Sequence, residues 1–203
     1  MNEAIDAYVG IVTKPGANNT VIETLSDRFL DVSPFKVIGP YSLLVKIRAE
    51  NEKELRDKIY SIKRPSVPGC YNIRRLMPFI ILNEKLNPHY IEMSERLGRS
   101  SVDQIRGPDA FVFIQTMPQR TKDVQEEILK MDYLSPEFRS ASIVTGDVDI
   151  IAELYWEDIN DGYKHANEIV NHTIGVTHQF LVPVVRDYRD ARERLAELLK
   201  TQS

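Results

Sequence analysis

Two short turns of the sequence carry side chains and backbone amides that could hold a small ligand. The turn Gly146-Asp147-Val148-Asp149 places two carboxylates beside a glycine, and tight turns expose backbone N–H groups. Carboxylates can bind a ligand ammonium, and amides can bind a ligand carboxylate; a purely structural hairpin turn is the alternative. We predict a ligand-binding site formed by Gly146, Asp147 and Asp149, with Gly39, Tyr41 and Ser42 as candidates at the matching turn earlier in the chain.

The histidines and the single cysteine do not have the spacing of a metal site or a nucleophile. His165 and His172 are seven residues apart on one expected helix, whereas helical metal ligands usually lie three or four residues apart. Cys70 has no CxxC partner, which favours a small buried apolar side chain. His89 and His178 are expected to be exposed or hydrogen-bonded. Since phosphate-loop and hydrolase motifs are also missing from the sequence, we expect no catalytic residue, metal or cofactor.

The composition is that of an ordinary globular protein with an acidic balance. The net charge of the 203 residues is −4, and binding to nucleic acid requires clustered Lys and Arg. Lys63-Arg64 and Arg74-Arg75 are small basic spots that could contact an acidic partner, although solvated edges explain them as well. One cysteine and the lack of a long apolar run favour a reducing compartment and no membrane span. We expect a cytoplasmic protein without direct nucleic-acid binding.

A repeat organises the chain. Residues 7–15 match residues 110–118, with Ala, Val, Ile, Thr and Pro at equivalent positions. Residues 36–47 match residues 143–154 in their apolar pattern and in one glycine. Near the end of each copy, Leu76-Met-Pro78 matches Leu181-Val-Pro183. Self-similarity of this kind indicates duplicated structural units.

Hydrophobic periodicity predicts strand, helix, strand, strand, helix, strand in each copy. For the first copy we expect a strand at 7–13, a helix opening at Thr20, a hairpin at Gly39-Pro40, a helix capped by Asn51 and a last strand after Gly69. For the second we expect a strand at 111–116, helices at 121–131 and 158–172, a hairpin at Gly146-Asp147 and a strand at 176–184. Pro78 and Pro183 lack a ladder donor, which favours sheet-edge positions for the fourth strands.

This order predicts an α+β fold of two tandem ferredoxin-like βαββαβ domains, forming a barrel-like pseudo-dimer with a C-terminal helix. We place the first domain at residues 1–82, a partly helical linker at 83–107, the second domain at 108–186 and the C-terminal helix at 187–203. The sheet face that the helices leave uncovered must be buried against a partner sheet. Lys46 and Glu153 occupy equivalent positions with opposite charge, which would suit an asymmetric interface between the copies, although two solvated side chains would explain them too.

The βαββαβ unit with a Gly-Asp-x-Asp turn resembles the effector-binding (RAM) domain of the Lrp/AsnC regulators. The second copy has the turn at Gly146 to Asp149 and a glycine, Gly175, before its last strand. In the first copy, Pro40 and Ser42 replace the turn aspartates. The family's regulators also carry an N-terminal helix-turn-helix, for which we expect no room before the first strand.

The resemblance implies a non-catalytic regulatory protein that binds a small effector such as an amino acid. It also implies a homo-oligomer formed through the sheets, and action through oligomerisation or through a DNA-binding partner regulator. Two alternatives come from other classes. The first is a ferredoxin-like α/β enzyme or haem-related protein, because a fold does not fix its function. The second is a structural heterodimerisation partner of a transcription regulator.

Overall fold

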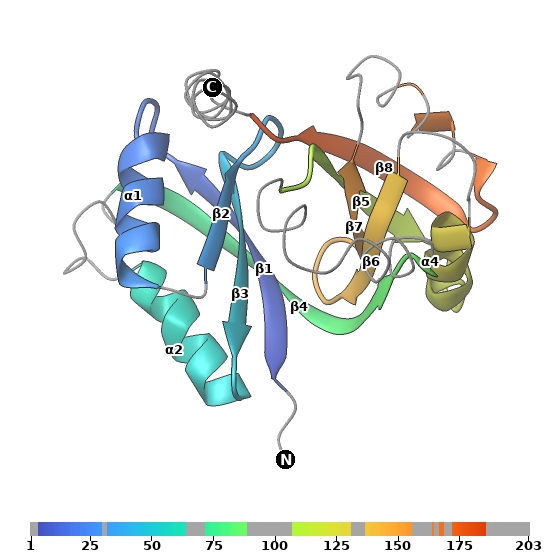
Figure 1. The fold of residues 1–203 in the computed structure, drawn as a ribbon, viewed down its shortest axis with the longest axis horizontal. Coiled ribbons are helices and arrows are strands. Elements are labelled where there is room, and N and C mark those ends of the chain that lie inside the picture. The colour runs from blue at the N-terminus through green and yellow to red at the C-terminus, as the bar shows by residue number, and fades with distance from the viewer. Residues whose placement is uncertain are drawn as a thin grey trace, which may run out of the picture.

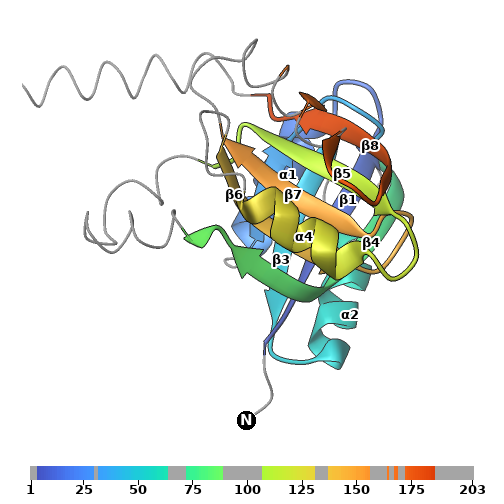
Figure 2. The same cartoon turned by 90° about the vertical axis from the view of Figure 1, so that its right-hand side faces the viewer.

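The described part of the chain forms an α+β fold with one eight-stranded antiparallel sheet and three helices. The computed structural model describes residues 4–29, 32–63, 72–88, 107–130, 137–155, 164, 167–168 and 172–185. Figures 1 and 2 show helices on the outer flanks of the molecule and strands between them. Among these residues, no helix is both long enough and apolar enough to span a membrane.

The elements follow the same order in the two halves of the chain. The first half contains β1 (Ile5–Thr13), α1 (Asn18–Arg28), β2 (Val32–Lys36), β3 (Leu43–Ala49), α2 (Glu52–Ile62) and β4 (Ile73–Leu86). The second contains β5 (Ala110–Thr116), α4 (Thr121–Lys130), β6 (Glu137–Val144), β7 (Ile150–Tyr155) and β8 (Val176–Pro183). The expected α+β class is therefore confirmed.

The strands run in the order β2-β3-β1-β4-β6-β7-β5-β8. Each half contributes four adjacent strands, in the order that a ferredoxin-like unit has. The two ends of the sheet also meet, because Val37 and Val184 form an antiparallel bridge and Val185 N donates to Lys36 O at 2.7 Å. The two ends of the sheet consequently touch where β2 ends and β8 ends, and the sheet curves round towards a barrel.

In each half, the helices pack through their apolar side chains on the outer face of the sheet. In the first half, Val21 and Leu25 of α1 and Leu55 and Ile62 of α2 pack on alternate residues of β1, β3 and β4. In the second half, α4 packs through Val124, Ile128 and Leu129 on β5, β6 and β7. Asn51 caps α2 as predicted, accepting from Glu54 N at 2.9 Å, whereas α1 begins at Asn18, two residues before the predicted Thr20.

The inner face of the sheet is filled by side chains from both halves. Tyr8, Phe79, Phe111 and Phe113 are fully buried there, and burying each large apolar side chain contributes about 1.5–3 kcal/mol. Their rings meet edge to face, as in the pair Phe79 and Phe113 at 5.7 Å. The predicted burial of the inner face is met within one chain.

Three features differ from the expected boundaries or lie beyond the described residues. β4 runs to Leu86, past residue 82 where we ended the first domain. Pro78 pairs with β1, and β6 pairs with the part of β4 that follows it, from Ile81 onward, so β4 is not at an edge of the complete sheet. Most of the expected linker, most of the helix at 158–172 and the whole C-terminal helix lie outside the described residues.

Candidate functional site

A group of charged side chains lies where the two halves face each other. Lys46 of β3 forms an ion pair with Glu84 of β4, with Nζ 2.7 Å from Oε1. The same Nζ lies 3.8 Å from Glu153 Oε1 of β7, in the other half of the chain. The side chains are 29%, 26% and 13% exposed, respectively. A ligand can therefore reach an ammonium that is flanked by two carboxylates.

Two buried hydroxyl groups hold these carboxylates in place from the barrel interior. Tyr8 OH donates a hydrogen bond of 2.7 Å to Glu153 Oε1, and Ser142 Oγ donates one of 3.4 Å to Glu84 Oε1. Burial raises the pKa of the Tyr8 phenol well above its usual value, and the charges of Glu153 and Glu84 raise it further. The phenol thus stays protonated and remains a hydrogen-bond donor to Glu153.

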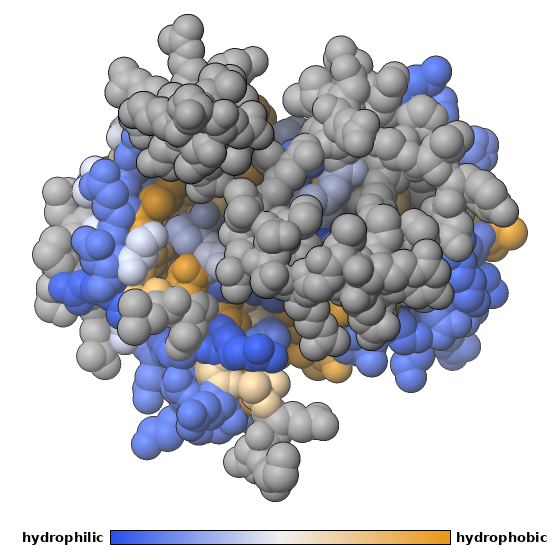
Figure 3. Space-filling model, in the orientation of Figure 1, coloured by the Kyte–Doolittle hydropathy of each residue, from blue (hydrophilic) through white to orange (hydrophobic). Residues whose placement is uncertain are grey.

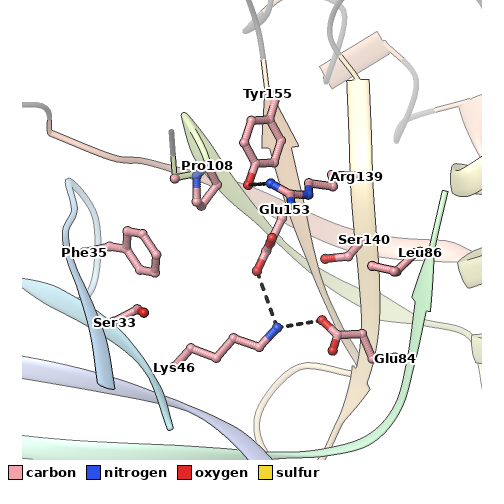
Figure 4. Close-up of a pocket in the computed structure, with 11 residues that line it drawn as sticks. Ser33, Phe35, Lys46, Glu84, Leu86, Pro108, Arg139, Ser140, Glu153 and Tyr155 are labelled. Atoms are coloured by element: carbon pink, nitrogen blue, oxygen red, sulfur yellow. Dashed lines mark hydrogen bonds and ion pairs between the residues drawn. The ribbon is translucent and has the colours of Figure 1, made fainter. Parts of the chain in front are cut away.

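The charged group forms one wall of a pocket with a volume of about 420 Å³, within the range typical of small-molecule sites. Figure 4 shows side chains from both halves pointing towards the pocket, with Lys46 between Glu84 and Glu153. Polar and aromatic residues share its surface. The described residues that line it are Ser33, Phe35, Lys46, Glu84, Leu86, Gly107, Pro108, Arg139, Ser140, Glu153 and Tyr155.

Two irregularities in the sheet bring side chains to this pocket. The register between β4 and β6 shifts between Ile81 and Asn83, just before Glu84. The register between β6 and β7 shifts between Phe138 and Ser140, and the neighbours Arg139 and Ser140 both line the pocket. An unbroken strand would point adjacent side chains to opposite faces. β-Bulges of this kind often re-aim side chains beside functional sites.

A second polar pair forms the opposite wall of the pocket. Arg139 Nη1 donates a hydrogen bond of 3.0 Å to the Tyr155 hydroxyl, and the guanidinium lies 5.2 Å from the centre of the Tyr155 ring. Arg139 thus supplies a second cation and Tyr155 an aromatic face (Figure 4). Together with Lys46 and the two carboxylates, they give the pocket both charges and both kinds of hydrogen-bonding group.

The turn predicted to bind ligand in the second half lies elsewhere, packed against β4. A Cβ on Gly146 would lie 2.8 Å from Phe79 Cδ1, and its φ is +133°. Asp149 Oδ2 accepts from Thr116 N at 2.7 Å, while Asp147 O accepts from Gln115 Nε2 at 2.8 Å. These contacts give the turn residues structural partners, and none of the three predicted residues lines the pocket.

The matching residues of the first half, Gly39, Tyr41 and Ser42, also lie outside the pocket lining. Gly39 approaches Val182 of β8, and Ser42 Oγ accepts from Thr13 N at 3.2 Å. Tyr41 packs 6.0 Å from Phe79; burial raises the pKa of its phenol, the Asp147 charge raises it further, and Arg75 lowers it. The charge of Asp147, in the other half of the chain, thus acts on Tyr41. A ligand role for the six turn residues stays a prediction.

The remaining candidates lie away from the pocket or outside the described residues. His178 is on β8, its ring centre 6.3 Å from that of Phe180, and His172 is exposed before the same strand. Arg74 and Arg75 are on β4, and Lys63 follows α2. Cys70, His89, His165 and Arg64 fall on residues whose structure is not described.

Of the pocket residues, the sequence singled out Lys46 and Glu153 but not Glu84, Arg139, Ser140 or Tyr155. The equivalent positions of Lys46 and Glu153 predicted an interface between the copies, and the 3.8 Å separation is consistent with that prediction. Alternation along the strand would have placed Tyr155 on the same face as Glu153. The other three residues depend on register shifts, for which the sequence carries no clear signal.

No family model matches this sequence, and no curated protein matches it either. Solved structures with the same fold do. The siroheme decarboxylase NirDL matches with a TM-score of 0.63 at 8% identity, over 90% of this chain and 72% of that one. Chlorite dismutase from Candidatus Nitrospira defluvii in complex with imidazole matches with a TM-score of 0.55 at 11% identity, over 95% of both chains. An anthrone oxidase-like protein matches with a TM-score of 0.52 at 11% identity, over 92% of both chains.

These matches share the fold at low identity, and they correct the function expected from the sequence. We expected a non-catalytic regulator that binds an amino-acid-like effector. This expectation is wrong: the structures that resemble the chain over nine-tenths of its length include a siroheme decarboxylase and chlorite dismutases. None of the three named above is an Lrp/AsnC regulator, and the resemblance to that family stays a prediction.

Proposed function

We propose that this chain is a ferredoxin-like α/β enzyme that binds a small polar molecule in the pocket between its two halves. The observation that carries the proposal is Lys46, which lies 2.7 Å from Glu84 and 3.8 Å from Glu153 at the pocket wall. An ammonium beside two carboxylates can donate a hydrogen bond or proton to a bound molecule while a carboxylate accepts one. Tyr8 fixes Glu153 for that role by its 2.7 Å hydrogen bond.

The matches to enzymes of the same fold support a catalytic over a purely regulatory role. They do so as analogy, since one fold can carry many activities. The geometry of the pocket gives the physical support: a general acid and a general base must both lie within hydrogen-bonding reach of one bound molecule, and Lys46 and Glu153 line the same pocket. In this arrangement Glu153 is the candidate base, and Lys46 is the candidate acid.

The test measures binding and turnover with a panel of small polar compounds that includes imidazole, the ligand in one of the similar structures. We expect one or more compounds to raise the melting temperature of the protein, and Lys46→Met to remove that shift. NMR spectra of each binding compound, recorded during incubation with the protein, would reveal conversion.

Lys85→Met is the matched control. Lys85 also forms a 2.7 Å ion pair, with Glu126, but does not line the pocket. Its variant should retain every shift seen with the unmodified protein. A panel that binds equally well to the Lys46 and Lys85 variants would contradict the assignment of the site.

A haem-related function is the second candidate, favoured by the TM-score of 0.63 to a siroheme decarboxylase. The described lining of the pocket does not fit a haem well. Haem iron is usually held by His, Cys, Met or Tyr, and of these the lining offers Tyr155, whose hydroxyl is hydrogen-bonded to Arg139. Glu84 and Glu153 would also repel the propionates of a haem. An absorbance titration with haem or sirohaem tests this candidate, and a Soret band that persists after gel filtration would favour it over our first proposal.

We also propose that the two halves are copies of one ferredoxin-like unit that pair as a pseudo-dimer. Their strand orders agree, and each half reaches the other at equivalent places, through Val37 with Val184 and through Val144 with Ile81. In a symmetric pair of identical chains, a two-fold axis would set like residues against each other. Tandem copies allow Lys46 to meet Glu153, a pairing of opposite charges. Further homo-oligomerisation stays a prediction, which light scattering can test.

A further inference from the structure

One buried hydroxyl at the pocket has no partner among the residues that the structure describes. Among all the described residues, the buried side-chain atoms without a hydrogen-bond partner are Arg120 Nε, Gln125 Oε1 and Ser140 Oγ. Of these three residues, Ser140 is the one that lines the pocket. It is 1% exposed, and a hydroxyl buried without a hydrogen bond destabilises the fold.

The position of Ser140 directs this hydroxyl towards the charged group. Ser140 pairs with Glu153 across β6 and β7, and its side chain lies on the pocket side of β6 (Figure 4) with Oγ almost fully covered, so a turn of the side chain brings the hydroxyl to a bound molecule. Ser142, two residues along β6, instead donates to Glu84. On β6, the Ser142 hydroxyl therefore donates to the Glu84 carboxylate, whereas the Ser140 hydroxyl has no hydrogen-bond partner among the described residues.

The charged groups of the described lining balance one another. Lys46 and Arg139 are cationic, and Glu84 and Glu153 are anionic. Each already has a partner: Lys46 lies between the two glutamates, and Arg139 donates to Tyr155. An anion would meet the carboxylates of Glu84 and Glu153, and a cation would meet Lys46 and Arg139, so the described lining gives neither sign of charge an excess of partners. Figure 3 shows that further hydrophilic side chains lie on the outer flanks of the molecule.

We infer that the pocket takes an uncharged molecule with a hydrogen-bonding carbonyl, hydroxyl or ring nitrogen, and that Ser140 Oγ binds that group. The inference rests on the proposed function, because it concerns the same pocket. It adds the charge class of the ligand and a residue that selects for it. An uncharged ligand satisfies the free hydroxyl and leaves the Lys46 and Arg139 pairs intact.

The experiment titrates the protein with four probes followed by NMR: acetamide and imidazole as uncharged probes, at a pH where imidazole is neutral, and acetate and methylammonium as charged ones. We expect the uncharged probes to bind more tightly. Ser140→Ala should weaken the better uncharged probe by about three- to tenfold, the effect of one neutral hydrogen bond. Ser61→Ala, which removes a hydroxyl from α2 away from the pocket, should leave the affinity unchanged.

The melting temperature of the unliganded variant separates a ligand contact from a structural role. Removing an unpartnered buried hydroxyl should leave the melting temperature of Ser140→Ala unchanged or raise it, while a serine needed by the strand would lower it on replacement. Tighter binding of acetate or methylammonium, or equal affinity of the Ser140→Ala variant, would overturn the inference while the proposed function stood. Failure of all four probes to bind would count against both.

Discussion

Lys46 and Glu153 occupy equivalent positions in the two halves of the chain, and the structure places their charged groups 3.8 Å apart. Each is joined to a further residue of the barrel, Lys46 to Glu84 and Glu153 to Tyr8. The pair therefore links three strands of the first half to one strand of the second. Its partial exposure allows the same residues to serve both the interface and a ligand.

Exchanging the charges of this pair tests the interface. Lys46→Glu would set a third carboxylate beside Glu84 and Glu153, and we expect a loss of about 1–3 kcal/mol in the free energy of unfolding, limited by solvent screening of these partly exposed groups. Adding Glu153→Lys should recover part of that loss, because opposite charges face each other again. Urea unfolding of both single variants and the double variant gives the coupling energy. Additive effects of the two substitutions would show that the residues do not interact.

We expect Tyr8 to make the protein lose stability as the pH rises into the alkaline range. The folded state raises the pKa of the phenol well above 10, so the stability gained from the neutral phenol is complete below pH 10 and is lost as the pH rises above that value. Tyr8→Phe should be less stable by about 1–3 kcal/mol at pH 8, since it removes a donor to a charged carboxylate. Between pH 8 and pH 11 the variant should lose less stability than the unmodified protein.

Urea unfolding of the Tyr8→Phe variant at several pH values measures this difference. Tyr60→Phe is the control, because Tyr60 is 63% exposed on α2. A gap between the Tyr8 variant and the unmodified protein that stays constant up to pH 11 would contradict the assigned role of the phenol.

The two hairpin glycines should differ in how they tolerate a side chain. A Cβ on Gly146 would lie 2.8 Å from Phe79, whereas one on Gly39 has its nearest neighbour, Val182, at 3.6 Å. Both have positive φ, so both alanine variants carry backbone strain, of the order of 1 kcal/mol. Only Gly146→Ala adds a clash in a packed core, and it should cost about 1–3 kcal/mol more. Thermal unfolding compares the two, and equal losses would mean that the close approach to Phe79 is not limiting.

The fold was more accessible from the sequence than the site. The repeat of residues 7–15 at 110–118 and the alternation along it predicted strands that the structure confirms as β1 and β5. Strand pairing follows from such local patterns because side-chain alternation fixes which face is buried. The Asn51 cap was also predictable because it too is a local pattern, which involves residues only three positions apart.

The pocket was not predictable to the same degree, because it depends on contacts distant in sequence and on irregular strands. Glu84 lies beyond residue 82, in a stretch that we assigned to the linker, and it faces Lys46 after a register shift in β4. The Gly146 turn attracted a ligand prediction through its aspartates, yet Asp149 holds Thr116. A turn motif shows which groups are available, while the packing around it decides which of them remain free.

A crystal structure of the protein with the panel compound that raises its melting temperature most tests the central claim directly. We predict that the compound lies in the pocket between the halves, within hydrogen-bonding distance of Lys46 or Glu153. A compound bound instead at the Gly146 turn, with Lys46, Glu84 and Glu153 contacting only one another and solvent, would contradict it.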